Sequence, residues 1–398
     1  MLNPFYYYSL TWGAVILLYQ IPMTKYNQGL DIGLLFFFLS TILCSLLMGI
    51  KYRNIFRFKE VQNENLTLFP VLLIAIGYTI EFVNAGFIPF VAFCTGTAEY
   101  GDFTGMKGLH VLITGAGTYY AIKYYYFALC TLKKRRKYLT AFALILSFIL
   151  LTFTRSQLIF IAAIAAILTL SYVESKKKLT FKGKVYLIVF AVFLLYMNGG
   201  LGNLRQGFSW NDSSYITGMG KFYWWPPIIP DVFKWAYLYI ITPIANLNYN
   251  VQISNISGNL SGFLAELVPE SLGNRIFSMS QIKTELLASY FTVSTGWSKV
   301  YINCGMLGVY ALYSFTVLLF LVCINHYCRK NDKKNMTQFL ALYSGLYIFM
   351  FFTNTFVSIS FSLVLWIYLF KIFLSHWKKV RIVKKKALYF SRVRGCRG

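Results

Sequence analysis

A single arginine separates two long apolar runs in the stretch "LTFTRSQLIF", residues 151–160. A guanidinium group keeps its charge at every accessible pH and is costly to place in hydrocarbon. Its planar donors bind phosphate and carboxylate groups in a bidentate manner. Arg155 is therefore a candidate for holding a phosphorylated ligand. The alternative roles are a helix cap or an anchor at a membrane interface.

Two further arginines, Arg205 and Arg275, lie in a long, more polar segment in the second half of the chain. The segment also contains "FYWWPPIIP" (222–230) and "ANLNYN" (245–250), whose rings and amides suit sugar binding. The alternative for the two tryptophans is an aromatic belt at a membrane interface. These residue types predict a positively charged site for an anionic ligand that carries sugars.

A carboxylate, Glu81, lies inside the apolar run "LLIAIGYTIEFVNAGF", where an acidic side chain is a functional candidate by default. Its place near the end of the run favours a structural role, because water can reach it there. The three histidines are scattered and the seven cysteines form no CxxC pair, so we expect no metal and no cofactor. Motifs for binding nucleotides are also missing from the sequence.

Apolar residues make up 57% of the chain and charged residues only 13%, against about a quarter in soluble proteins. We expect an all-α polytopic integral membrane protein with about ten spans, within a range of ten to twelve. The predicted spans are residues 5–21, 30–50, 67–88, 108–130, 138–153, 157–173, 185–198, 303–326, 337–353 and 355–375.

The basic residues behind the net charge of +25 are concentrated between the apolar runs. This placement favours a role in membrane topology and lipid contact over nucleic-acid binding. Basic clusters of this kind mark cytoplasmic loops. Both termini are therefore expected in the cytoplasm. The clusters are residues 51–59, 133–137, 176–184, 329–334 and 371–398.

The run from Tyr138 to Tyr172 is too long for one crossing, because 35 helical residues would span roughly 50 Å. One crossing would also place a basic cluster on the outside. Two short helices joined near 154–157 satisfy both constraints. Arg155 then lies at the external tip of a helical hairpin.

The expected organisation has four parts. A large external loop domain with interfacial helices separates two membrane bundles, and a basic cytoplasmic tail ends the chain. The parts are residues 1–198 (about seven spans), 199–300 (the loop), 301–376 (about three spans) and 377–398 (the tail).

This layout resembles the O-antigen polymerase (Wzy) family. The resemblance rests on "TFTRSQLIF" at the hairpin tip, on the large external loop, on "YLYIITPIANLNYNV" (237–251) and on "YFTVSTGWSKVYINCGMLGVY" (290–310). Many members have an aspartate before the first glycine of the last motif. Here Asn303 and Cys304 precede Gly305, so no acidic role is carried over to that position.

The resemblance implies polymerisation of undecaprenyl-diphosphate-linked oligosaccharide repeat units, of O-antigen or capsule, at the outer face of the bacterial cytoplasmic (inner) membrane. Its partners would be that lipid-linked substrate, membrane lipids and a chain-length regulator protein, with no metal or cofactor. The expected roles are a diphosphate clamp at Arg155 and Arg205, help from Arg275 or Lys299, a general base at Glu266 within the apolar "SGFLAELVP", and sugar contacts at Asn246, Asn248 and Tyr290.

Two alternatives remain open. An O-antigen ligase would use the same donor but depends, by resemblance, on an external histidine, and His110 is the only one near the outside. A flippase or other transporter would carry more charges inside its spans than Glu81 and Lys123.

Overall fold

The computed structural model describes residues 2–61, 65–95, 97, 103–152, 154–176, 180–277, 284–375 and 377. Within these residues, all regular secondary structure is helical apart from one isolated bridge between Thr24 and Phe222, which confirms the predicted all-α class. The helices are α1 (Pro4–Gln20), α2 (Ile32–Tyr52), α3 (Phe69–Ala85), α4 (Pro89–Cys94), α5 (Leu109–Cys130), α6 (Arg135–Leu151), α7 (Arg155–Ser175), α8 (Phe181–Arg205), α9 (Ser214–Gly220), η1 (Asp231–Phe233), α10 (Lys234–Gln252), α11 (Leu260–Ala265), α12 (Glu270–Ile276), α13 (Ser298–Lys330), α14 (Lys333–Phe349) and a last helix, Ile359–Ser375.

Each of the ten predicted apolar segments overlaps a helix, and the junction predicted near 154–157 is present slightly earlier, between Leu151 and Arg155. Helix α6 ends at Leu151 and α7 begins at Arg155. The hydroxyl of Thr152 donates to the carbonyl of Ile149 at 2.7 Å, so it satisfies one of the carbonyl groups that the end of α6 leaves free. Two helices, not one, therefore connect the basic clusters on either side.

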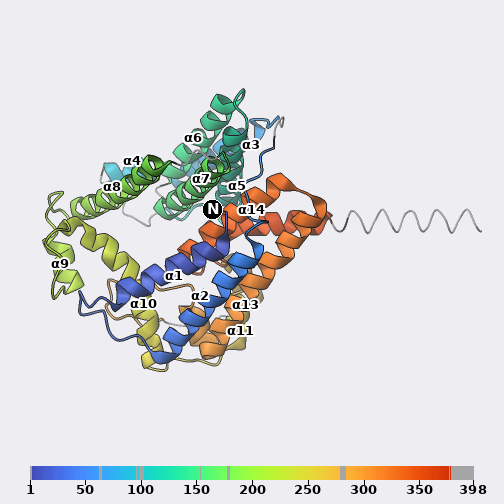
Figure 1. Ribbon diagram of the computed structural model, residues 1–398. Helices are drawn as coiled ribbons and strands as arrows, with labels where there is room; N and C mark the ends of the chain where they lie inside the picture. Colours follow the sequence, from blue (N-terminus) through green and yellow to red (C-terminus); the bar gives the residue numbers. More distant parts are fainter. Residues whose placement is uncertain are drawn as a thin grey trace, which may run out of the picture.

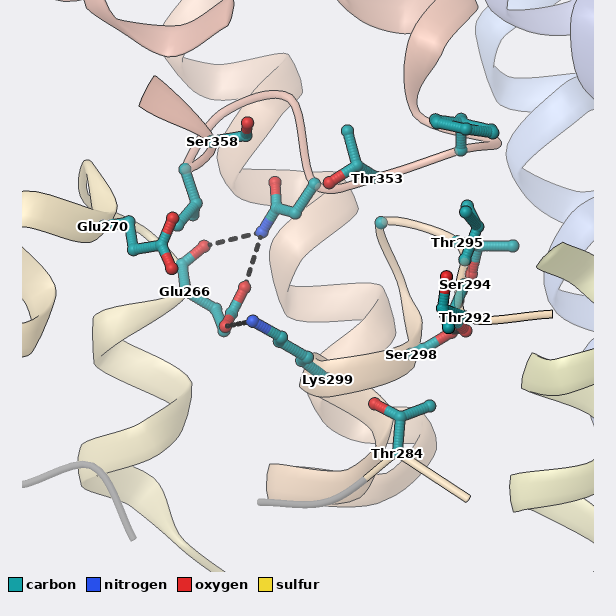
Figure 2. A pocket seen from close by; sticks show the side chains of 15 residues that line it. Glu266, Glu270, Thr284, Thr292, Ser294, Thr295, Ser298, Lys299, Thr353 and Ser358 are labelled. Carbon is teal, nitrogen blue, oxygen red and sulfur yellow. Dashed lines mark hydrogen bonds and ion pairs between the residues drawn. The ribbon is translucent and has the colours of Figure 1, made fainter. Parts of the chain in front are cut away.

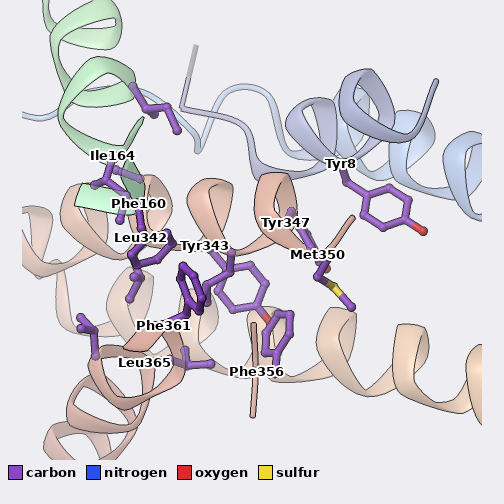
Figure 3. Close-up of a cluster of buried hydrophobic side chains, with 14 of the residues drawn as sticks. Tyr8, Phe160, Ile164, Leu342, Tyr343, Tyr347, Met350, Phe356, Phe361 and Leu365 are labelled. Atoms are coloured by element: carbon purple, nitrogen blue, oxygen red, sulfur yellow. The ribbon is translucent and has the colours of Figure 1, made fainter. Parts of the chain in front are cut away.

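Helix α14 lies between two groups of helices, as Figure 1 shows. One group contains α3, α5, α6 and α7, and the other contains α1, α2, α10 and α13. Helix α14 contacts α5 and α7 on one side and α1 and α13 on the other. Its tyrosines explain this central position: Tyr343 and Tyr347 are fully buried and pack with Tyr8 and Phe356 (Figure 3).

Residues 199–300, predicted to be an external loop domain, pack closely against the flanking helices. Helix α8 continues to Arg205, beyond the predicted limit at 198. Helix α10 is buried along most of its length and contacts α1, α8 and α13. It therefore packs inside the fold, where it contacts both the first helix and α13.

Among the described residues, three helices are long and apolar enough to cross a membrane, namely Ile32–Tyr52, Ser156–Ser175 and Ser298–Lys330. Phe69–Ala85 and Ile359–Ser375 are shorter apolar helices. Helix α2 shows why lipid is a suitable surrounding: its exposed apolar side chains recur at the spacing of one helical face, which water would not solvate well. They are Ile32, Phe36, Leu39, Leu43, Leu46, Leu47 and Ile50.

Candidate functional site

A cavity of about 350 Å³ opens where the end of α11, the start of α13 and the loops 284–296 and 350–358 meet (Figure 2). Its volume falls within the range of roughly 300–1,000 Å³ that is usual for sites of small ligands. Most of the lining residues have polar side chains. It includes two carboxylates, one lysine and seven hydroxyl side chains: Glu266, Glu270, Lys299, Thr284, Thr292, Ser294, Thr295, Ser298, Thr353 and Ser358.

Glu266 is the buried carboxylate of this cavity, with only 2% of its surface exposed. It follows the last residue of α11, in the apolar stretch that predicts its burial. The amide nitrogen of Asn354 donates to Glu266 Oε2 and to the Glu266 carbonyl, each at 3.1 Å. Burial raises the pKa of Glu266, and the Lys299 ammonium, 3.9 Å from Oε1, opposes that rise. A carboxylate of this kind is a stronger base than one in water.

A close approach of α11 to α13 sets the spacing between Glu266 and Lys299. The side chain of Asn259 caps α11 by accepting from the Gly262 N–H at 3.0 Å. A Cβ at Gly262 would lie 2.2 Å from Asn303 Oδ1, so any other residue there would displace the Asn303 side chain. Asn303 in turn donates to the Lys299 carbonyl at 2.9 Å. This contact therefore fixes the carboxylate relative to the lysine.

Hydroxyl groups form the opposite wall, in the stretch "TVSTGWS", residues 292–298. Ser294 and Ser298 are in close hydrogen-bond contact, and Thr295 Oγ1 lies 3.1 Å from Ser298 Oγ. The Gly296 N–H donates to the Met350 carbonyl at 2.8 Å, which ties this wall to the loop 350–358. Figure 2 shows these hydroxyls across the cavity from the carboxylates, with Lys299 between them.

The loop that carries the hydroxyls is held by asparagines of α10. Asn246 donates to the carbonyls of Phe291 and Val293, both at 2.8 Å, and accepts from the Leu287 N–H at 3.0 Å. Asn250 bonds the N–H and the carbonyl of Glu285. The Asn246 amide is buried and engaged, so a direct sugar contact would require these hydrogen bonds to break. Asn246 is thus a positioning residue for the cavity wall.

Two other predicted sugar contacts are also engaged elsewhere. Asn248 is buried, accepts from the Asp31 N–H at 2.8 Å and donates to the Gly29 carbonyl at 3.0 Å, so it holds the connection between α1 and α2. The Tyr290 hydroxyl contacts the Tyr26 hydroxyl at 2.5 Å. Neither Asn248 nor Tyr290 lines the cavity. A sugar could reach the half-exposed Tyr290 ring but not the Asn248 amide.

The structure places the backbone of Arg155 at the same end of the fold as the cavity. Phe160, five residues or roughly 7 Å further along α7, packs on Phe349 and Phe361. These two rings flank the loop 350–358 that lines the cavity. The side chain of Arg155 lies outside the described part of the structure.

Neither the backbone of Arg205 nor the exposed Arg275 is placed beside the cavity lining that the structure describes. Arg205 ends α8 beside the start of α10, where Trp235 donates to Asn203 at 2.7 Å. Trp235 precedes Asn246 by roughly 16 Å of helix. The start of α10, beside which Arg205 lies, is therefore well separated from the cavity wall that Asn246 holds. The Arg205 side chain, like that of Arg155, is outside the described part. Arg275 is exposed near the end of α12 and does not line the cavity.

Sequence reasoning identified Glu266 and Lys299 but missed several side chains that complete the site. Glu270 lines the cavity at the start of α12, where its N–H donates to the Val357 carbonyl at 3.0 Å. Asn354 was missed too, although a polar residue between two apolar runs in "FFTNTF" was a usable signal. The dense hydroxyls of "TVSTGWS" were a second signal.

Among the described residues, no group of three or more His, Cys, Asp or Glu side chains could hold a metal ion. No protein-family model, no curated protein and no solved structure matches the chain. The chemistry of the cavity is therefore the feature of the molecule that bears on its function.

Proposed function

We propose that the chain is a multi-pass protein of the bacterial cytoplasmic membrane, with about ten spans and a cavity on the outer face, and that it polymerises undecaprenyl-diphosphate-linked oligosaccharide units by glycosyl transfer. The observation that carries the proposal is the buried Glu266, which borders a cavity walled by hydroxyl groups. A base beside groups that hydrogen-bond a sugar is what activation of a sugar hydroxyl requires.

In the proposed reaction, Glu266 takes the proton from a hydroxyl of the acceptor sugar. The hydroxyl oxygen forms a bond with the anomeric carbon of the donor, and the bond from that carbon to the diphosphate oxygen breaks. The diphosphate leaves with the electron pair and its charge. No nucleotide is consumed, because the sugar–diphosphate linkage already supplies an activated donor.

Two cationic residues have separate roles in this proposal. Lys299 lies 3.9 Å from Glu266 and keeps a fraction of this buried carboxyl ionised, as a base must be. Arg155, at the tip of the hairpin on the same end of the fold, binds the departing diphosphate. In this proposal Arg155 alone has the second role; Arg275 is exposed near the end of α12, and the Arg205 side chain is outside the described part of the structure.

The ligase alternative depends on an available external histidine. His110 is paired with Glu81 at 2.9 Å, away from the cavity, and this pairing supports a polymerase over a ligase.

The experiment that tests the proposal uses a host that makes the polysaccharide and lacks this chain. We expect single repeat units to reach the cell surface and long chains to be missing, with long chains restored by the wild-type sequence. Arg155→Ala should restore none and Arg155→Lys only a little, since lysine lacks the bidentate donors. If the units stayed on the cytoplasmic side, a flippase would replace the proposed polymerase.

A further inference from the structure

We propose that the cavity beside Glu266 binds the acceptor sugar and selects a ring that carries no negative charge, while the donor diphosphate binds outside it. This inference rests on the proposed function and names the class of substrate that the cavity takes.

The charged side chains that line the cavity disfavour an anionic ligand. Among the described lining residues, Lys299 is the only one with a positively charged side chain, and Glu266 and Glu270 carry carboxyl groups. Arginine, the residue that best matches phosphate oxygens, is missing from the described lining. With both carboxyls ionised, the lining carries two negative charges and one positive charge. A diphosphate would therefore meet net repulsion from the described lining whenever Glu266 is ionised, which is the state that the proposed base must adopt.

Glu266 and Glu270 differ in a way that makes Glu270 the selective residue. Glu266 is buried, and its charge is partly balanced by Lys299 and Asn354. Glu270 is exposed at the rim, and no ion pair involving its carboxylate occurs among the described residues. Its backbone is fixed to Val357. An incoming carboxylate or phosphate would face this uncompensated charge first, whereas a hydroxyl or an amine could donate to it.

The opposite wall fits a sugar ring. Thr292, Ser294, Thr295 and Ser298 offer hydroxyls that both donate and accept, which matches the mixed donors and acceptors of a sugar. A volume of about 350 Å³ leaves room for a small ligand of this kind but not for a polyprenyl chain. The acceptor end of one lipid-linked unit is thus separated from the diphosphate of the other.

The test measures binding of short oligosaccharides to the full-length protein in lipid nanodiscs. One series ends in a neutral hexose, one in the matching amino sugar and one in the matching uronic acid. We expect the uronic acid series to bind about tenfold more weakly than the neutral one, with a smaller difference at high salt. Glu270→Gln should narrow the difference to about threefold or less.

A matched control is Glu285→Gln, because Glu285 is an exposed acid of the neighbouring loop that does not line the cavity. It should leave the discrimination unchanged. Equal binding of the three series, or equal effects of the two substitutions, would overturn the inference. The polymerase proposal fails separately: a protein that discriminates in binding but never lengthens a lipid-linked unit would refute polymerisation and leave the sugar site in place.

Discussion

Two buried carboxylates, Glu81 and Glu266, lie at ends of helices in different regions, and their surroundings differ sharply. Glu81 accepts from the Met106 N–H at 3.2 Å and pairs with His110 at 2.9 Å, so both of its oxygens are used in fixing α3 to the start of α5. Glu266 has one close amide partner, a distant lysine and a cavity in front of it. Burial alone therefore does not identify a reactive acid; the partners and the adjoining space do.

The largest expected effect comes from replacing each carboxylate with its amide. Glu266→Gln should lower chain lengthening by about 10²–10⁴-fold, the usual contribution of a general base. Glu81→Gln should keep most of the activity and lower the free energy of unfolding by about 1–3 kcal/mol, because a buried charge-assisted hydrogen bond is lost. Lengthening assays and thermal unfolding of both variants measure this difference.

The same two variants should also differ in stability, and here Glu81→Gln should show the larger loss. Burial raises the folded-state pKa of Glu266, so stability falls as the pH rises from about 4.5 through that raised pKa. Glu266→Gln removes this cost, and its unfolding temperature at pH 7 should equal or exceed that of the wild type. A strongly destabilised Glu266→Gln protein would show that the carboxylate is structural, as that of Glu81 is.

The next effect concerns the asparagines that hold two different loops. Asn246→Ala removes three hydrogen bonds to the cavity wall, and Asn248→Ala removes bonds to the α1–α2 connection. Each should cost about 2–3 kcal/mol in the free energy of unfolding. Only Asn246→Ala should also weaken binding of the acceptor. Equal losses of acceptor affinity would contradict a specific role of Asn246.

A smaller effect is expected at the contact between α11 and α13. Gly262→Ala should cost about 1–3 kcal/mol through overpacking, because the new Cβ meets Asn303 Oδ1. Asn303→Ala in the same chain should recover part of the lost activity, which a double-mutant cycle would measure. Gly218→Ala is the control, since nothing lies within 4 Å of its Cβ position. If Asn303→Ala does not recover any activity, the contact between α11 and α13 does not control the position of Glu266.

The smallest expected effect is on the pH dependence. Lys299 lowers the pKa of Glu266, so Lys299→Met should raise that pKa further and move the acid limb of the lengthening activity to higher pH. Lys299→Arg should keep the wild-type profile. The shift is modest because the Lys299 side chain is 56% exposed and solvent screens its charge. An acid limb that stays in place would show that Glu266 does not govern it.

The long helices could be predicted from the sequence because each depends on a local apolar run, and the existence of a break near Arg155 followed from the length of its run. Short helices such as α9 and α12 lack such a run and were not predicted. The burial of Glu266 also followed from its neighbours in the chain. Tertiary proximity could not be predicted in the same way. The buried asparagines of α10 resemble surface amides in sequence, and spacing along the chain does not reveal that Asn354 lies beside Glu266. The span count and the polymerase activity stay predictions.

The most direct test of the account supplies the purified protein, in nanodiscs, with an undecaprenyl-diphosphate-linked repeat unit and no nucleotide sugar. The account predicts lipid-linked chains of two or more units, with one undecaprenyl diphosphate released for each new glycosidic bond and neither product from Glu266→Gln. Unchanged single units with no released undecaprenyl diphosphate, from a protein that is folded and binds the acceptor, would contradict it.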